Sequence, residues 1–178
     1  DKLRDSNNVV GLAYLPIAMR AFTNSKRAIE SPADMAGLSF RVLDVPTLVA
    51  WMKEFKASAV PMSMAELYMS LQNGTVDGQE NPLDTIKNQA FYEVQDYLSI
   101  TNHIWSFSLF AANAKFWDKL TAEQQDILKE CAVEASAEIK ELAPKVNDAA
   151  YDFLVNEKGM KVNTLTDEQW LEFQKAAK

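Results

Sequence analysis

The sequence predicts an α/β fold, because helix-start signals and short apolar runs alternate along its N-terminal half. Two serines, Ser31 and Ser63, are each followed three residues later by an acid, which is the pattern of a helix capping box. The runs Leu38–Val42 and Ala59–Met62 have the length and apolar content of buried strands. A sheet covered by helices is therefore expected rather than a helical bundle.

Further helices are expected where a proline or a capping residue precedes apolar residues at helical spacing. The longest of them is capped by Thr121–Gln124, contains Pro144 and is ended by Gly159. A helix of this length would be able to brace two lobes of a larger fold. The other expected helix starts are Pro46, Pro82 and Thr166.

More strands are expected from β-branched, aromatic and leucine residues later in the chain. In chain order they are Val76–Gly78, Tyr97–Ile100, Ile104–Ala112 and Met160–Leu165. The composition of Ile104–Ala112 predicts a buried strand, and we expect it in a different sheet from the first strands.

The composition is that of an acidic globular domain without known enzyme motifs. The chain has 178 residues, 48% hydrophobic and 24% charged, and its net charge of −7 gives it no general attraction for nucleic acid or anionic lipid. A single cysteine and a single histidine cannot build an internal disulfide or a Cys/His zinc site within this chain. Nucleotide-binding loops and nucleophile elbows are not found. We expect no nucleic-acid partner, no metal and no cofactor, and no membrane-embedded segment in this chain.

Polar side chains at the carboxyl ends of the first three strands form the candidate binding site. In open α/β sheets, ligands bind beyond these ends, where helix N-termini also point. The strand ends are Arg41–Asp44, Met62–Met64 and Gln79–Asn81. Arg41 is the sharpest signal, because a guanidinium beside a helix start can hold a carboxylate with two parallel hydrogen bonds. The alternative is a surface arginine paired with a neighbouring acid.

The other candidate residues each have a structural alternative. Asn81 can donate to a carboxylate, or it can serve only as the entry to the following helix. Asp44 can bond ligand hydroxyls or an amine, or it can cap the helix that begins at Pro46. Met64 and Trp105 can line a pocket, or they can be ordinary core residues.

Several segments of the chain carry a family resemblance. They are Phe22–Ile29, Ser31–Val42, Pro61–Leu83, Phe91–Gln95 and Thr101–His103. Within them, the run V-D-G-Q-E-N-P at Val76–Pro82 is highly specific. From Tyr14 onward the sequence resembles the DctP-type receptors of TRAP transporters.

The resemblance implies a periplasmic-binding-protein-like, two-lobed receptor, of which this chain is the C-terminal portion with a long helix bracing the lobes. On this resemblance, a signal peptide and most of the N-terminal lobe of the family would lie outside the sequence. Residues 1–16 would be a remnant of the N-terminal lobe and crossover, and residues 17–104 the ligand-binding C-terminal lobe. Residues 105–145 would return to the N-terminal lobe as a strand and the long helix. Residues 146–178 would complete the C-terminal lobe with the terminal helix.

The resemblance also implies roles for particular residues. In similar receptors the arginine that ends the G-L-x-x-R-V strand forms the principal salt bridge to the ligand carboxylate, and here this residue is Arg41. Asn81 of Q-E-N-P would add a hydrogen bond, and Arg20 occupies the place of a second arginine. An acid at Asp44 disfavours a second ligand carboxylate and favours a polyol, hydroxy acid or amine. The residues expected to set selectivity are Asp44, Met64, which stands where several relatives have an aromatic residue, and Trp105.

The implied function is that of a periplasmic solute-binding receptor of a TRAP-type secondary transporter. Such a receptor binds a small organic acid and delivers it to the membrane subunits of the permease without a chemical reaction. Two alternatives stay open, a ligand-sensing module of a signalling system and an enzyme acting on a carboxylate substrate. Turnover of a substrate would identify the enzyme, and neighbouring genes for permease subunits would favour transport.

Overall fold

The computed structural model describes residues 2–177, which divide into two compact units. Unit 1 comprises the described residues up to Ala18 together with Trp105–Val146. Unit 2 comprises Met19–Ile104 and the described residues from Asn147 onward. Unit 2 contains the strand ends to which the sequence assigns the candidate site.

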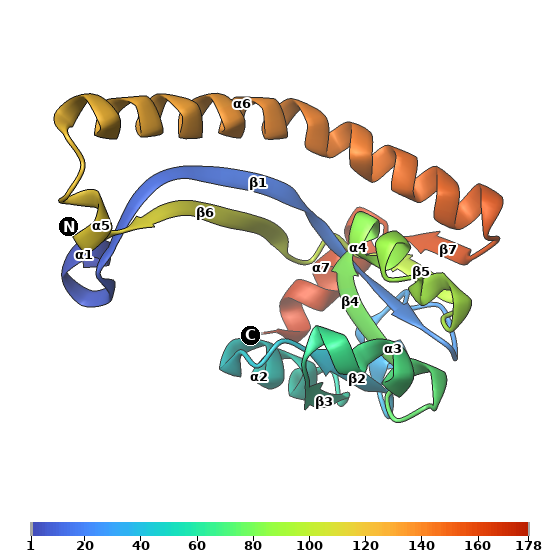
Figure 1. The fold of residues 1–178 in the computed structure, drawn as a ribbon. Helices are drawn as coiled ribbons and strands as arrows, with labels where there is room; N and C mark the ends of the chain where they lie inside the picture. The colour runs from blue at the N-terminus through green and yellow to red at the C-terminus, as the bar shows by residue number, and fades with distance from the viewer. Residues whose placement is uncertain (1, 178) are drawn as a thin grey trace. The chain divides into compact units, whose positions relative to one another are not determined.

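Unit 2 is built on a mixed sheet with the strand order β3-β2-β4-β1-β5-β7 (Figure 1). Strand β2 pairs in parallel with β3 and β4, and β5 pairs in parallel with β7. Strand β1 lies antiparallel between β4 and β5. The carboxyl ends of β2, β3 and β4 therefore meet at one edge of the sheet. The strands are β1 (Val9–Asn24), β2 (Ser39–Val42), β3 (Ser58–Pro61), β4 (Gly78–Pro82), β5 (Tyr97–Ile100) and β7 (Lys161–Thr164).

The helices of unit 2 begin largely where the local sequence predicts. The capping boxes Ser31–Asp34, Ser63–Glu66 and Thr166–Gln169 are confirmed, because the last residue of each accepts a hydrogen bond from the backbone N–H of the first, at 2.8, 3.1 and 2.9 Å. The elements are the 3₁₀ turns Pro32–Met35 and Phe91–Glu93, α2 (Pro46–Glu54), α3 (Met64–Gln72), α4 (Leu83–Asn88), the end of α6 (Ala122–Asp152), a π turn at Phe153–Glu157, and α7 (Asp167–Ala176).

Two apolar cores cover the two faces of this sheet. Ala21 and Phe22 are neighbours on β1, yet Ala21 belongs to core 1 and Phe22 to core 2, because successive side chains on a strand point to opposite faces. Core 1 includes Leu67 of α3. Core 2 includes Met52 of α2 and Phe173 of α7. The face on which a residue of the sheet lies can therefore be inferred from its neighbours along the strand, which point to the opposite face and belong to the core on that side.

The third strand differs from its predicted position. Val76–Gly78 was the expected range, whereas β4 begins at Gly78 and runs to Pro82. The backbone N–H groups of Thr75 and Val76 both donate to the carbonyl of Ser70, at 2.9 and 3.4 Å, so this segment still belongs to the turn that leaves α3. The shift places the whole Q-E-N-P run inside the sheet.

Unit 1 contains α1 (Lys2–Asn7), the first half of β1, β6 (Trp105–Asn113), α5 (Ala114–Trp117) and the first part of α6. The expected burial of Ile104–Ala112 is wrong, because the residues Trp105 and Phe107 of β6 are 65% and 66% exposed. The expectation of a different sheet is also wrong, because β6 pairs with β1 and so belongs to the same seven-stranded sheet as β2, β3 and β4. In unit 1, β6 and the first half of β1 pair only with each other among the described strands, and two strands alone cannot bury both of their faces. Within residues 2–177, no helix is both long and apolar enough to cross a membrane.

Candidate functional site

Arg41 is a buried cation at the carboxyl end of β2. Its neighbours across the sheet are Val60 of β3 and Gln79 of β4, and only 2% of its surface is exposed. The Nε–H group donates to the carbonyl oxygen of Met62 at 3.0 Å. Within residues 2–177, Nη1 of Arg41 is fully buried and has no hydrogen-bond partner. The alternative of a surface arginine paired with an acid is therefore wrong.

The electrostatic surroundings of Arg41 leave it short of compensating charge. Burial lowers the pKa of Arg41, Glu80 acts against this by raising the pKa, and Arg20 lowers it further. Because a guanidinium stays protonated in proteins, the cost of burial remains as a demand for an acceptor. An anion would supply this acceptor by taking a hydrogen bond from Nη1 of Arg41.

Arg20 forms a buried ion pair with Glu80 on the neighbouring strand. Its Nε donates to Oε2 of Glu80, and its Nη2 donates to Oε1 at 3.0 Å, so the pair is bidentate. The same Nη2 donates to the carbonyl of Glu80 at 2.6 Å and to Oδ1 of Asn81 at 2.9 Å. Arg20 is 8% exposed and Asn81 is 3% exposed. The structure thus brings Arg20 and Asn81 into direct contact.

His103 completes this cluster on the other side of Glu80. Its Nε2 lies 3.3 Å from Oε2 of Glu80, and its Nδ1 lies 2.6 Å from the hydroxyl oxygen of Thr101. Burial lowers the pKa of His103 more than the contact with Glu80 raises it, which makes the imidazole neutral at pH 7. Burial raises the pKa of Glu80, but the hydrogen bonds from His103 and Arg20 outweigh it and hold the pKa below its ordinary value. Nε2–H therefore donates to an ionised Glu80, and Nδ1 accepts from Thr101.

A chain of hydrogen bonds between side-chain amides and a hydroxyl group orients the side chain of Asn81. Nδ2 of Asn81 donates to Oε1 of Gln79 at 2.5 Å, and Nε2 of Gln79 donates to the hydroxyl oxygen of Thr23 at 2.9 Å. The Thr23 hydroxyl in turn donates to Oε1 of Gln95 at 3.0 Å. The sequence analysis placed Gln79 and Glu80 at a strand end without assigning them a role, and it missed Thr23 and Gln95. The available signal was the run of polar residues inside a segment that had to be a central strand.

The remaining candidate residues lie in different environments. Met64 is the first residue of α3, is half-buried and packs against core 1. Asp44 is exposed in the loop before α2, and the expectation that it caps this helix is wrong, because the cap residue is Val45. Trp105 is the first residue of β6 and belongs to unit 1. Of the six candidate residues, Arg20 on β1, Arg41 on β2 and Asn81 on β4 are the buried ones.

Metal ligands do not cluster in the described part of the chain. Among residues 2–177, His, Cys, Asp and Glu side chains form no group of three or more that could hold a metal ion. The polar cluster around Arg41 consists of guanidinium groups, amides and one ion pair, which is a donor-rich set suited to binding an anion.

Comparisons with known proteins place the chain among solute receptors. A model of bacterial extracellular solute-binding protein, family 7, named DctP, matches residues 1–178. The C4-dicarboxylate-binding periplasmic protein DctP of Vibrio cholerae is 38% identical over 165 residues, which is 90% of this chain and 48% of that protein. The 2,3-diketo-L-gulonate-binding periplasmic protein YiaO of Escherichia coli is 35% identical over 156 residues, which is 88% of this chain and 47% of that protein.

Solved structures agree with these sequence matches. A TRAP periplasmic solute-binding protein from Sulfitobacter sp. NAS-14.1 with bound β-D-galacturonate has a TM-score of 0.93 and 29% identity, covering 99% of this chain and 57% of that chain. The chain thus spans about half the length of the curated relatives that it matches. The predicted α/β fold class and the family resemblance are both confirmed. The chain belongs to family 7 of the bacterial extracellular solute-binding proteins, the DctP family.

Proposed function

We propose that this chain carries the carboxylate-anchoring part of a periplasmic receptor that binds a small organic acid for a TRAP-type permease. The observation that carries the proposal is the buried Arg41, whose Nη1 has no hydrogen-bond partner within residues 2–177. A carboxylate would supply the missing acceptor and would compensate the buried charge. The ligands named for similar proteins, a C4-dicarboxylate, 2,3-diketo-L-gulonate and β-D-galacturonate, all carry a carboxylate group.

Asn81 and Arg20 support this anchor in different ways. The Asn81 amide nitrogen has two N–H groups, and one of them donates to Gln79, so the other is suited to a ligand oxygen. Arg20 is held in two hydrogen bonds by the Glu80 carboxylate and donates to Oδ1 of Asn81. We propose that Arg20 assists binding mainly by orienting Asn81, because its charge is already compensated by Glu80.

Selectivity is proposed to depend on Asp44, Met64 and Trp105. An exposed carboxylate at Asp44 would repel a second carboxylate and accept from hydroxyls or an amine. Met64 would give the ligand a flexible apolar contact, at the position where an aromatic residue would stack against the ligand. Trp105 stays a prediction from the family resemblance and requires its own variant. We further propose that unit 2 is the ligand-binding lobe, and that the ligand is released unchanged to the membrane subunits.

Calorimetric titration of the 178-residue chain tests the anchor. Galacturonate, succinate and the uncharged methyl ester of galacturonate would be titrated into wild type and Arg41→Ala. Loss of a charge-assisted, bidentate bond should weaken binding of the acids by about 1.5 to 3 kcal/mol or more, which is roughly tenfold to more than a hundredfold. The ester should bind weakly to both proteins.

The matched control is Arg27→Ala, which removes the same charge from the same unit. Arg27 is exposed and donates to the carbonyls of Asp34 and Ala36 at 2.8 Å, so its loss should leave acid affinity near the wild-type value. Equal binding of the acids by wild type and Arg41→Ala would refute the proposed anchor. Recovery of each ligand unchanged by mass spectrometry after incubation would distinguish a receptor from an enzyme.

A further inference from the structure

Unit 2 contains an apolar cavity of about 380 Å³ that is separate from the sheet edge at Arg41. Its wall includes Phe22, which belongs to core 2. On β2, the neighbours Phe40 and Val42 belong to the same core, so the Arg41 side chain starts from the opposite face of the sheet. The cavity and the proposed carboxylate anchor therefore lie on different faces of the same sheet.

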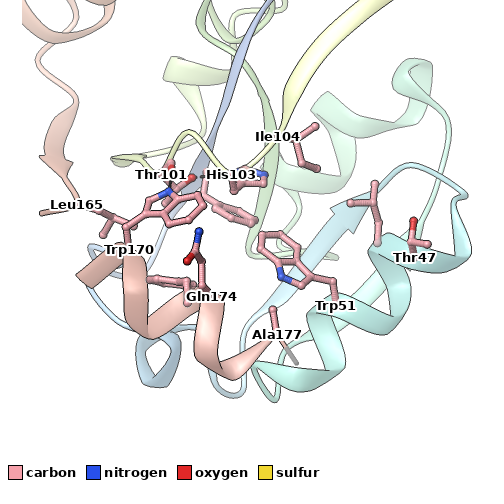
Figure 2. A pocket seen from close by; sticks show the side chains of 12 residues that line it. Thr47, Trp51, Thr101, His103, Ile104, Leu165, Trp170, Gln174 and Ala177 are labelled. Atoms are coloured by element: carbon pink, nitrogen blue, oxygen red, sulfur yellow. Dashed lines mark hydrogen bonds between the residues drawn. The ribbon is translucent and has the colours of Figure 1, made fainter. Parts of the chain in front are cut away.

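The walls of this cavity, which we call the aromatic pocket, combine aromatic rings with aliphatic and uncharged polar side chains. Figure 2 shows the side chains of Trp51, Trp170, His103 and Gln174 around one space, with Ile104 and Leu165 beside them. The His103 ring stacks on Phe22 with centroids 4.4 Å apart at 17°, and on Trp51 at 5.1 Å and 21°.

Hydrogen bonds hold two of these rings in place. The Nε1–H group of Trp170 donates to the carbonyl of Thr101 at 2.8 Å, and both ring nitrogens of His103 are engaged by Thr101 and Glu80. The rings are therefore fixed before any molecule enters the pocket. A preformed wall of this kind lowers the entropic cost of binding a flat ligand.

The chemistry of the pocket favours a neutral ligand. His103 is uncharged at pH 7 because burial lowers its pKa, and among residues 2–177 no Asp, Glu, Lys or Arg side chain lines the pocket. Within residues 2–177, the Gln174 side-chain amide forms no hydrogen bond, so it can offer one to a ligand. An organic acid would lose its hydration here without gaining a cationic partner.

We propose that the aromatic pocket is a second binding site, which takes a small, neutral, aromatic molecule carrying one polar group, such as a phenol. Its volume falls within the range of small-molecule sites, and its lining of rings with one convergent amide is the pattern of such sites. The phenol hydroxyl would donate to or accept from the Gln174 amide, while its ring packs against Trp51 and Trp170.

The tryptophan indole N–H signals of ¹⁵N-labelled protein test this proposal with p-cresol as the probe. The chain has four tryptophans. Trp51 and Trp170 line the pocket, whereas Trp105 and Trp117 belong to unit 1. Addition of p-cresol should shift the Trp51 and Trp170 signals along a saturable curve with a dissociation constant of about 1 mM or lower, and should leave the other two unmoved. The charged analogue 4-methylbenzoate should bind at least about tenfold more weakly at this site.

Variants separate the pocket from non-specific contact. Gln174→Trp, on an exposed face of α7, should fill the space and weaken p-cresol about tenfold or more without disturbing a buried residue. Ala177→Phe tests the same space from the next turn, in case the first variant does not fold. Arg41→Ala should leave p-cresol binding unchanged. Shifts that never saturate, that are equal at all four indoles, or that persist in both filling variants would overturn the second site.

Discussion

Both carboxylate oxygens of Glu80 accept hydrogen bonds from the guanidinium of Arg20, across the antiparallel pairing of β1 and β4. The two residues are 60 positions apart in the chain, and Glu80 is completely buried. The pair neutralises one of the two buried arginines of unit 2. Arg41 is then the buried cation that still lacks a full set of acceptors within residues 2–177.

Glu80→Gln should destabilise the protein by about 3 to 5 kcal/mol, because it leaves Arg20 as a buried and uncompensated charge. Urea unfolding followed by circular dichroism measures this loss. Asp126→Asn is the control, because its pair with Lys129 is exposed and should be worth less than about 0.5 kcal/mol. Adding Arg20→Met to Glu80→Gln should recover part of the loss, and strictly additive effects would contradict the coupling.

Stability should fall as the pH is lowered from 7 to 5, because the pKa of His103 in the folded state lies below its ordinary value. The unfolded chain takes up a proton near pH 6.5 while the folded chain does not, so protonation favours unfolding, by up to about 1.4 kcal/mol per pH unit. His103 is the single histidine of the chain, so His103→Gln should flatten the profile in this window. The lowered pKa of Glu80 acts in the same direction only at more acidic pH, below its ordinary value. Stability that rises on acidification from pH 7 to 5 would show that His103 is charged in the fold.

Gly78→Ala should destabilise the protein by about 3 kcal/mol, because β4 leaves no room for a methyl group at this position. A Cβ atom there would lie 2.3 Å from the carbonyl oxygen of Thr23 and 2.7 Å from the ring of Phe40. Gly11→Ala on β1 is the matched control, since its added methyl would meet only side chains at 3.5 Å or more. Thermal unfolding of both variants decides the point, and equal melting temperatures would contradict it.

Arg41→Met should leave the ligand-free protein as stable as wild type, or more stable by about 1 kcal/mol, although it removes the proposed anchor. The apolar replacement removes the cost of burying a charge with an unpaired nitrogen, and the carbonyl of Met62 loses one hydrogen bond in return. Arg27→Met should instead destabilise by about 1 kcal/mol, because two carbonyls lose their donors. A loss above about 2 kcal/mol in Arg41→Met would mean that Arg41 mainly stabilises the fold.

Features that depend on a few neighbouring residues could be predicted from the sequence. The capping boxes at Ser31, Ser63 and Thr166 form as expected, because each closes a hydrogen bond over three residues. The parallel strands β2, β3 and β4 likewise place Arg41 and Asn81 at one edge, as the rule for α/β sheets requires. The division of the chain into lobes, and the ligand roles of these residues, stay predictions.

The sequence by itself determined the α/β class, the family and the candidate arginine, since local patterns and a specific motif carry that information. Tertiary structure alone decided that Arg41 is buried with a nitrogen that has no hydrogen-bond partner in the described part of the chain, that Arg20 is paired with Glu80, and that Trp105 is exposed. Burial and ion pairing depend on contacts between residues far apart in the chain, here on strands whose register brings position 20 beside position 82. A periodic pattern can place a residue on a strand, but the charge that it meets there is set by the packing of the other strands.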